Sequence, residues 1–292
     1  MPGLVWFNGC TSPLEDTTVP AADHAHLYGD GLFEGIRIYG RKVFKLDEHL
    51  SRLYDGCKAL KINMALDQDK LKAIVLETCR KADISDGYIR LNVTRGTGLG
   101  LDPRAVKTEP NVMVMVSSLT LYAPEMYETG LQVVTTSWRV IPPDALDPRI
   151  KCIGRYAANI QAKHEANRAG AGEGLMLNAQ GHIAECTGDN IFLVRNGVVF
   201  TPHPSCGILQ GITRDTIMAL LRNEGVEVEE TLLTTYDVYR AEEAFLTGTA
   251  AEVIPMVGLD GQPVGDGKPG PMTRKAIQLF RENVASGVPF DH

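Results

Sequence analysis

The segment "DPRIKCIGRY", residues 147–156, contains a lysine in surroundings suited to chemistry. Lys151 is followed by Cys152 and Ile153, and a proline-rich stretch, "VIPPDALDP", precedes it. An amine held in a partly dry cleft keeps its proton less tightly and becomes a nucleophile toward carbonyl compounds. The alternative is a solvated loop lysine, because most lysines in proteins are exposed.

Two turns rich in glycine and threonine are candidate phosphate sites. In "GILQGITRDTIMAL", Gly211, Ile212 and Thr213 precede an expected helix, and in "AFLTGTAAEV", Gly248 and Thr249 follow an expected strand. Free backbone N–H groups and the positive end of a helix dipole bind a phosphate without a basic side chain. An N-cap threonine is the alternative interpretation of the first turn.

Two charged residues stand in apolar surroundings: Arg37 in "GLFEGIRIYG" and Glu185 in "HIAECTGDNIFLV". For Arg37, the alternatives are a buried phosphate and a salt bridge to Glu34 or Glu48. For Glu185, they are a protonated pyridine nitrogen and an ordinary loop position. A reactive lysine, a phosphate site and an inward acid are together what pyridoxal phosphate requires: a covalent anchor, a phosphate anchor and a charge that keeps the ring an electron sink.

Periodic patterns predict the elements that position these residues. Helical spacing or glycine stops indicate helices over residues 45–62, 67–83, 156–170, 213–225 and 272–287. Runs rich in β-branched and apolar residues predict strands within 88–96, 111–122, 131–140, 174–185, 190–200, 243–248 and 252–264. Gln180-Gly181, Asn196-Gly197 and Asp260-Gly261 lie between such runs and predict hairpins.

The chain of 292 residues exceeds the usual size of one hydrophobic core, so two domains, or one large one, are expected. The N-terminal part is α+β, and from about residue 130 strands dominate, which favours a barrel or a curved sheet. Pro124 and its polar neighbours interrupt the strands. We therefore predict a domain over 1–119, an interdomain loop over 120–129 and a larger domain over 130–292.

Composition narrows the partners to small molecules. The net charge of −7 offers no basic excess for nucleic acid. No apolar run approaches the roughly 20 residues that span a bilayer, and no signal peptide is recognisable, so a cytoplasmic protein without a membrane partner is expected. The six cysteines form no CxxC pair, which favours reduced, mostly buried thiols over disulfides or a metal site.

Six motifs, in order and spacing, resemble those of the class IV aminotransferases, the fold-type IV pyridoxal-phosphate enzymes. They are "YGDGLFEGIR", "YIRLNVTRG", "PPDALDPRIKCIGRY", "HIAECTGDNIF", "GILQGITRD" and "FLTGTAAEVIP". Within the class, the chain looks most like the branched-chain amino-acid aminotransferases. The resemblance implies an α+β fold with a smaller N-terminal α/β sandwich domain and a larger, β-barrel-like C-terminal domain with flanking helices. It also implies a homodimer or an assembly of dimers.

The resemblance implies a role for each motif residue. Lys151 forms the Schiff base with pyridoxal phosphate, Glu185 partners its pyridine nitrogen and Tyr156 lies near its phenolic oxygen. The phosphate site comprises Arg37, Gly211, Ile212, Thr213, Gly248 and Thr249. The substrate side comprises Tyr28, Phe33, Tyr88, Arg90, Thr249 and Ala250, with Arg90 and the backbone at Thr249 and Ala250 as candidates for the α-carboxylate.

The expected reaction is transamination between L-leucine, L-isoleucine or L-valine and 2-oxoglutarate. Arg155 stands where branched-chain members often carry asparagine, and "GDG" at Gly29–Gly31 and "VTRG" at Val93–Gly96 also occur in D-amino-acid aminotransferases. That enzyme, an amine transaminase and an aminodeoxychorismate lyase are therefore alternatives. A dehydrogenase is disfavoured because "RGTGLG" is not a GxGxxG fingerprint. A binding module without catalysis would not need the lysine and phosphate motifs together.

Overall fold

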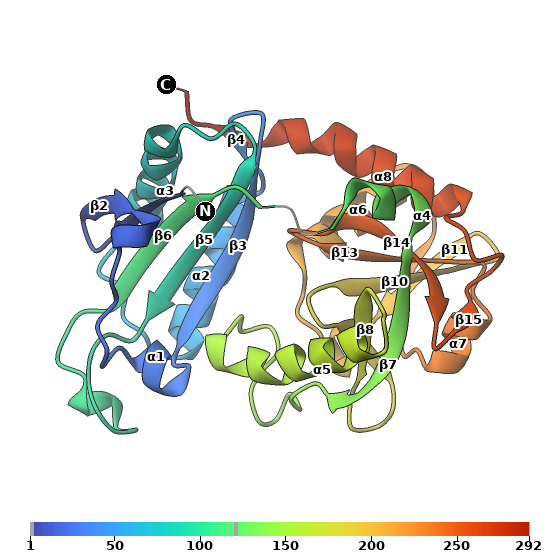
Figure 1. The fold of residues 1–292 in the computed structure, drawn as a ribbon, viewed down its shortest axis with the longest axis horizontal. Helices are drawn as coiled ribbons and strands as arrows, with labels where there is room; N and C mark the ends of the chain where they lie inside the picture. Colours follow the sequence, from blue (N-terminus) through green and yellow to red (C-terminus); the bar gives the residue numbers. More distant parts are fainter. Residues whose placement is uncertain (1–2, 120–121, 292) are drawn as a thin grey trace. The chain divides into compact units, whose positions relative to one another are not determined.

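The computed structural model describes residues 3–119 and 122–291, and its contacts divide the chain into two compact units (Figure 1). Unit 1 comprises Met1–Leu119, Ile150–Arg155 and Val284–His292, and unit 2 comprises Thr120–Arg149 and Tyr156–Asn283. The predicted domains 1–119 and 130–292 remain a prediction, because contacts do not establish which segments fold alone. The predicted interdomain loop, 120–129, contains helix α4 (Pro124–Thr129), while residues 120 and 121 lie outside the described residues.

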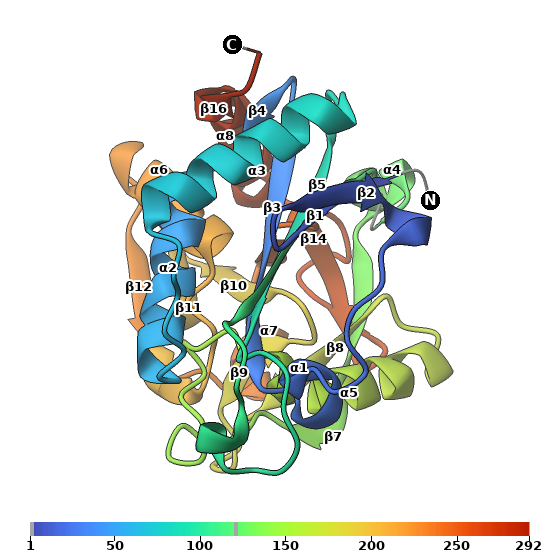
Figure 2. The ribbon, with the colours of Figure 1, turned by 90° about the vertical axis from the view of Figure 1, so that its left-hand side faces the viewer.

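Unit 1 is built on a seven-stranded sheet. In spatial order, its strands are β16 (Val288–Pro289), β4 (Lys42–Val43), β3 (Gly31–Tyr39), β5 (Gly87–Thr94), β6 (Asn111–Ser117), β1 (Gly3–Phe7) and β2 (Cys10–Pro13). Helices α2 (Leu46–Ala59) and α3 (Gln68–Ala82) cover one face of it (Figure 2). A short helix, α1 (His24–Tyr28), precedes β3.

Strand alternation divides the two faces of this sheet chemically. On one face of β3 and β5, every residue except Glu34 and Gly87 is apolar and fully buried against the helices: Leu32, Ile36, Ile38, Ile89, Leu91 and Val93. Burying each such side chain is worth about 1.5–3 kcal/mol, so the register of both strands is firmly set. The alternate residues, which include Phe33, Arg37 and Arg90, therefore lie together on the other face.

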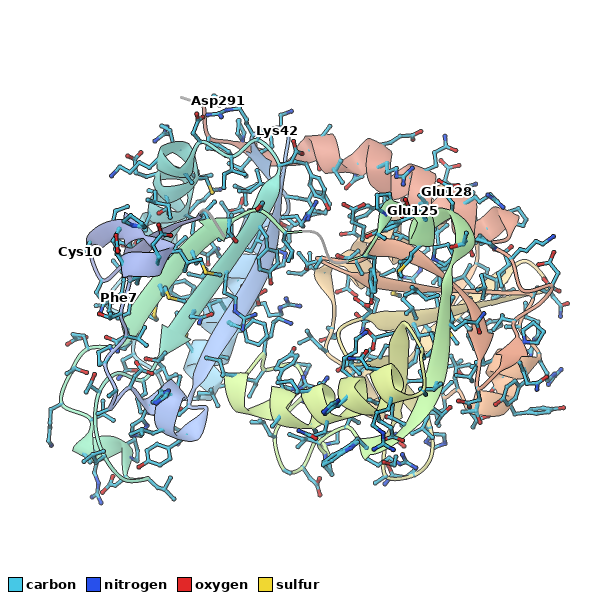
Figure 3. The ribbon with its side chains drawn as sticks, viewed as in Figure 1. Phe7, Cys10, Lys42, Glu125, Glu128 and Asp291 are labelled. Atoms are coloured by element: carbon cyan, nitrogen blue, oxygen red, sulfur yellow. The ribbon has the colours of Figure 1, made fainter. Side chains whose placement is uncertain are left out.

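The C-terminal segment returns to unit 1. Strand β16 pairs antiparallel with β4, and Arg41 forms an ion pair with Asp291. Lys42 and Asp291 accordingly lie at the same end of unit 1 (Figure 3). No local sequence pattern predicts the pairing of β16 with β4, because the two strands are far apart in the chain.

Unit 2 is built on a nine-stranded sheet. In order, its strands are β12 (Val228–Thr231), β11 (Val198–Pro202), β10 (Asn190–Arg195), β13 (Glu243–Gly248), β14 (Glu252–Leu259), β7 (Leu131–Arg139), β8 (Glu173–Leu177) and β9 (Ile183–Cys186), while β15 (Gln262–Pro263) pairs with β14. The register shifts at three places, in the pairs β14–β7, β7–β8 and β8–β9. Such irregularities bend and twist strands, as the predicted curved sheet requires.

Helices flank this second sheet. Helix α5 (Tyr156–Arg168) packs on β7 and β8, while α6 (Ile212–Asn223) and α8 (Pro271–Asn283) pack on each other. Helix α4 and α8 both contact β14, and α7 (Thr235–Tyr239) is a short helix before β13. All five predicted helices are present, and their ends differ from the predicted ones by a few residues. The α+β class is therefore confirmed.

The three predicted hairpins are present, and Gln180-Gly181 lies in the longer loop, 178–182, between the antiparallel strands β8 and β9. Asn196 and Gly197 have φ of 52° and 76°, and Asp260 and Gly261 have φ of 52° and 78°, the left-handed values that a two-residue hairpin loop requires. Five of the six cysteines are buried, Cys10 is exposed, and all are free thiols, as expected. Within residues 3–119 and 122–291, no helix is both long enough and apolar enough to cross a bilayer.

Candidate active site

The face of the unit 1 sheet that lies away from its helices gathers three predicted substrate residues. Gly35 of β3 pairs directly with Arg90 of β5, and the Arg90 guanidinium lies over the Phe33 ring, 3.5 Å from its centroid. The Tyr88 hydroxyl lies across Gly35, since a Cβ there would come within 2.0 Å of it. The glycine of "FEG" thus makes room for Tyr88 beside the Arg90–Phe33 pair.

Lys151 belongs to the same cluster. The segment Ile150–Arg155 is part of unit 1. Phe33 N donates to Lys151 O at 3.1 Å, and the backbones of Cys152 and Leu32 form an isolated antiparallel β-bridge. The Lys151 ammonium lies 4.6 Å from the centroid of the Phe33 ring. One aromatic ring therefore contacts both an amine and a guanidinium, a cation–π arrangement that concentrates positive charge where an anionic ligand would be bound.

Gly29 permits this placement of the lysine segment. Its φ is 70°, and a Cβ on it would come within 2.6 Å of Gly154 Cα, so only glycine allows the two backbones to approach this closely. Gly154 N donates to Gly29 O at 3.1 Å. The segment that carries Lys151 is thereby attached to the turn that leads into β3.

Arg37 does not form either of the salt bridges considered for it. Its Nη1 donates to Leu119 O at 3.2 Å, and its guanidinium lies 5.0 Å from the Tyr39 ring. Glu48 pairs instead with Lys45, and Glu34 points toward the helices. Both salt-bridge alternatives are wrong, and a phosphate contact of Arg37 stays a prediction.

Glu34 forms a buried ionic cluster that the sequence interpretation missed. Arg52 of α2 donates from Nε to Oε1 at 2.8 Å and from Nη2 to Oε2 at 2.7 Å, while His49 Nδ1 lies 2.7 Å from Oε2. Burial alone would raise the pKa of Glu34, but the charge and hydrogen bonds of Arg52 and the contact with His49 lower it to about 2. Glu34 is therefore ionised at neutral pH.

The charge of Lys151 acts on the buried side chain of His49. Burial lowers the pKa of His49, opposed by Glu34, and the positive charge of Lys151 adds to the lowering. The spacing of His49 and Arg52, three residues apart on one helix face, is the sequence signal that could have identified this cluster.

Tyr28 lies apart from the Arg90–Phe33 pair. It is 42% exposed, its hydroxyl accepts a hydrogen bond from Gly100 N at 2.9 Å, and its ring packs edge-on against His24. Among the contacts described for residues 3–119 and 122–291, none joins Tyr28 to Phe33 or Lys151. A substrate role for Tyr28 stays a prediction.

Asp30 of the motif "GDG" and Arg95 of the motif "VTRG" form an ion pair. Asp30 Oδ2 accepts from Arg95 Nε at 2.5 Å, Asp30 Oδ1 accepts from Arg95 Nη2 at 3.0 Å, and His24 Nδ1 lies 2.8 Å from Oδ2. Burial opposes ionisation of Asp30, but Arg95 and His24 outweigh it and lower the pKa. Arg95 also donates to the carbonyls of Leu60 and Lys61 at the end of α2. These motifs are scaffold and do not indicate a D-amino acid.

In unit 2, Glu185 is held by two N–H donors. Its Oε2 accepts from Leu209 N at 2.8 Å and from Asn190 Nδ2 at 3.3 Å. Both donors contact the same oxygen of this buried carboxyl group. An ionised carboxylate can keep a pyridine nitrogen protonated.

Asn190 joins Glu185 to the first predicted phosphate turn, a role that the sequence interpretation missed. Its Nδ2 also donates to Leu209 O at 3.0 Å, and its Oδ1 would lie 2.1 Å from a Cβ on Gly211. The absence of a side chain at Gly211 thus allows the asparagine to pack against the turn. The side-chain amide of Asn190 therefore links the position of Glu185 to the position of the turn at Gly211.

Helix α6 begins at Ile212 without a side-chain cap. Gly211 is its N-cap, so the alternative of an N-cap threonine is wrong, and Thr213 lies buried in the first turn. Because no side chain occupies the first N–H groups, they and the helix dipole are available to an anion.

The second turn follows β13. A Cβ on Gly248 would lie 2.0 Å from Asp189 Oδ1, so this buried carboxylate packs directly against the turn that leads to Thr249 and Ala250. Burial, reinforced by the charge of Glu173, raises the pKa of Asp189 to about 7.

Tyr156 is half-buried at the start of α5, and Arg155 is buried and does not face solvent.

Comparison with known proteins identifies the family of this chain. The family model described as amino-transferase class IV matches residues 31–258. A Methanocaldococcus jannaschii protein, provisionally assigned as a branched-chain-amino-acid aminotransferase, is 43% identical over 95% of each chain. The solved Escherichia coli branched-chain amino acid aminotransferase superposes with a TM-score of 0.94 at 34% identity, covering 99% of this chain and 96% of that one.

A second solved structure is that of a cofactor-bound enzyme. The branched-chain amino acid aminotransferase from Thermobaculum terrenum, in its PLP-form, gives a TM-score of 0.88 at 30% identity, over 98% of this chain and 94% of that one. Fold, motif order and sequence thus agree over nearly the whole length. The chain belongs to the class IV aminotransferases.

Proposed function

We propose that this protein transfers the amino group of L-leucine, L-isoleucine or L-valine to 2-oxoglutarate, with pyridoxal phosphate as its cofactor. The observation that carries the proposal is the placement of the Lys151 amine and the Arg90 guanidinium over one ring, that of Phe33. The relatives reported above are named as branched-chain aminotransferases, one of them provisionally. The scaffold role of "GDG" and "VTRG" removes the reason for preferring a D-amino acid.

The residues of unit 2 fit the cofactor. The uncapped start of α6 suits its phosphate, with Gly211, Ile212 and Thr213 supplying N–H groups. The doubly hydrogen-bonded carboxylate of Glu185 suits its pyridine nitrogen. When bound, pyridoxal phosphate supplies an aldehyde that condenses with amines and a ring that withdraws electrons from the substrate Cα. We assign Arg37, Gly248 and Thr249 to the phosphate as well, and Tyr156 to the phenolic oxygen.

Each residue of unit 1 then has a separate task. Lys151 Nζ would hold the cofactor covalently at rest and, once released, would take the proton from the substrate Cα and later return one. Arg90 binds the α-carboxylate through charge-assisted hydrogen bonds, with the backbone at Thr249 and Ala250 as a second donor set. We assign Phe33, Tyr88 and Tyr28 to recognition of the substrate side chain. One methylene is worth about 1–3 kcal/mol in a hydrophobic pocket, so all three donors should be accepted.

A single-turnover absorbance assay tests the function. L-leucine, L-isoleucine or L-valine should bleach the yellow holoenzyme, and 2-oxoglutarate should restore the colour. D-alanine and a simple aryl amine serve as controls and should react far more slowly. Faster bleaching by D-alanine than by L-leucine would refute the proposed donor.

The proposal includes a homodimer, or an assembly of dimers, in the cytoplasm. Leu99 and Leu101 of one loop are 71% and 81% exposed, and large apolar side chains gathered at a surface favour a protein interface. Free thiols are typical of a reducing compartment. Light scattering of the active enzyme tests the assembly, and a stable, fully active monomer would contradict it.

A further inference from the structure

Asn92 contacts the arginine to which the proposal assigns the α-carboxylate. It lies two residues after Arg90 on the same face of β5, and its Oδ1 accepts a hydrogen bond from Arg90 Nε at 3.1 Å. In the sheet register, Asn92 pairs directly with Phe33, the residue whose ring underlies the guanidinium. Asn92 and Phe33, which are paired on the adjacent strands β5 and β3, thus hold Arg90 from two sides.

Both of these contacts are neutral. An amide oxygen and an aromatic ring orient the guanidinium without cancelling its charge, and Arg90 makes no ion pair within the described part of the chain. Glu34, the buried acid of the neighbouring strand, points to the opposite face, where Arg52 neutralises it. The contact with Asn92 uses Nε and leaves both Nη groups of Arg90 to a ligand, where they can bind a carboxylate bidentately.

We propose that Asn92 is a positioning and specificity residue for carboxylate recognition. It orients Arg90 over Phe33 and, because it is neutral, leaves the full charge of the guanidinium to the carboxylate of the substrate. This inference rests on the proposed function. Aspartate has nearly the same shape and would accept the same hydrogen bond, but it would form an ion pair with Arg90 and compete with the ligand.

The experiment compares a charged and an uncharged ligand of nearly the same shape. The holoenzyme is titrated calorimetrically with 4-methylpentanoate, a branched carboxylate without a reactive amine, and with 4-methylpentanamide, its uncharged counterpart. The variants are Asn92→Asp, which adds a charge beside Arg90, and Asn92→Leu, which removes the hydrogen-bond acceptor without adding a charge. Asn63→Asp, at an exposed position, is the matched control for added charge.

We expect the parent and Asn63→Asp to prefer the carboxylate over the amide. Asn92→Asp should weaken carboxylate binding on the order of tenfold or more and leave amide binding almost unchanged, since an opposing charge acts only on the charged ligand. Asn92→Leu should weaken carboxylate binding less, because the charge of Arg90 remains. A merely structural role of Asn92 would change the affinities for both ligands alike.

A parental ratio of the two affinities in Asn92→Asp would overturn the inference. Arg90→Met separates that outcome from failure of the proposed function. If Arg90→Met loses the preference for the carboxylate while Asn92→Asp keeps it, only the role of Asn92 is wrong. If Arg90→Met keeps the preference as well, the carboxylate site assigned under the proposed function is wrong.

Discussion

Replacing Glu34 by glutamine removes a buried charge that Arg52 and His49 hold in place. A carboxyl whose pKa falls from its ordinary 4.5 to about 2 on folding contributes about 3 kcal/mol to stability, at about 1.4 kcal/mol per pH unit. Because the folded-state pKa is the lower one, this contribution is complete above the unfolded pKa. It is lost as the pH falls toward 2. Glu34→Gln should therefore cost unit 1 about 3 kcal/mol at pH 7 and only about 1 kcal/mol at pH 3.

Tryptophan fluorescence can follow unit 1 selectively. Trp6 packs against its core, whereas Trp138 of unit 2 is 42% exposed, so a Trp138→Phe background leaves Trp6 as the probe. Urea unfolding of the parent and Glu34→Gln in that background gives the free energy of unfolding at each pH. Urea is preferred to guanidinium chloride because salt screens charges.

Glu48→Gln is the matched control. Glu48 is a glutamate of the same unit that pairs with Lys45 at 2.7 Å. Because the Lys45 and Glu48 side chains are 31% and 48% exposed, loss of this pair should cost less than about 1 kcal/mol at every pH. A Glu34→Gln deficit below about 1 kcal/mol at pH 7, or one that does not shrink in acid, would refute the reasoning.

Three further substitutions test other contacts. Gly211→Ala places a Cβ 2.1 Å from Asn190 Oδ1 and should weaken cofactor binding about tenfold in a fluorescence titration, and unchanged affinity would contradict the packing argument. Asp30→Asn should lower the free energy of unfolding by about 1–3 kcal/mol without altering the preference for L over D donors, and a changed preference would contradict the scaffold role of Arg95. Glu185→Gln should retain the yellow colour but lose about a hundredfold or more in turnover, and parental turnover would show that Glu185 is structural.

Local patterns in the sequence were sufficient to predict the helices and hairpins. Amphipathic spacing located α2 and α3, and Asn-Gly and Asp-Gly located turns whose left-handed φ few other residues adopt. These features depend on neighbours in the chain. The pairing of β16 with β4 and the attachment of Ile150–Arg155 to unit 1 depend on contacts between distant segments, for which periodicity gives no signal.

The partner of a charged strand residue was predictable in part. Arg37 and Glu34 are three residues apart on β3, an odd spacing that places their side chains on opposite faces, so strand alternation alone excludes a salt bridge between them. The actual partner of Glu34 is Arg52, and it could not be identified from the sequence because the contact depends on how α2 packs on the sheet. Likewise, the motif "TGDNIF" contains Asn190, but its link between Glu185 and Gly211 appears only in the folded chain.

The covalent attachment of the cofactor to Lys151 is the central claim, and borohydride reduction tests it most directly. Reduction should fix pyridoxal phosphate irreversibly on the lysine, and trypsin would then no longer cleave after it. Mass spectrometry should find the peptide Ile150–Arg155 intact and carrying the cofactor, whereas protein freed of the cofactor should be cleaved after Lys151. An adduct on another lysine, such as Lys163, or normal cleavage after Lys151 in the reduced holoenzyme, would contradict the account.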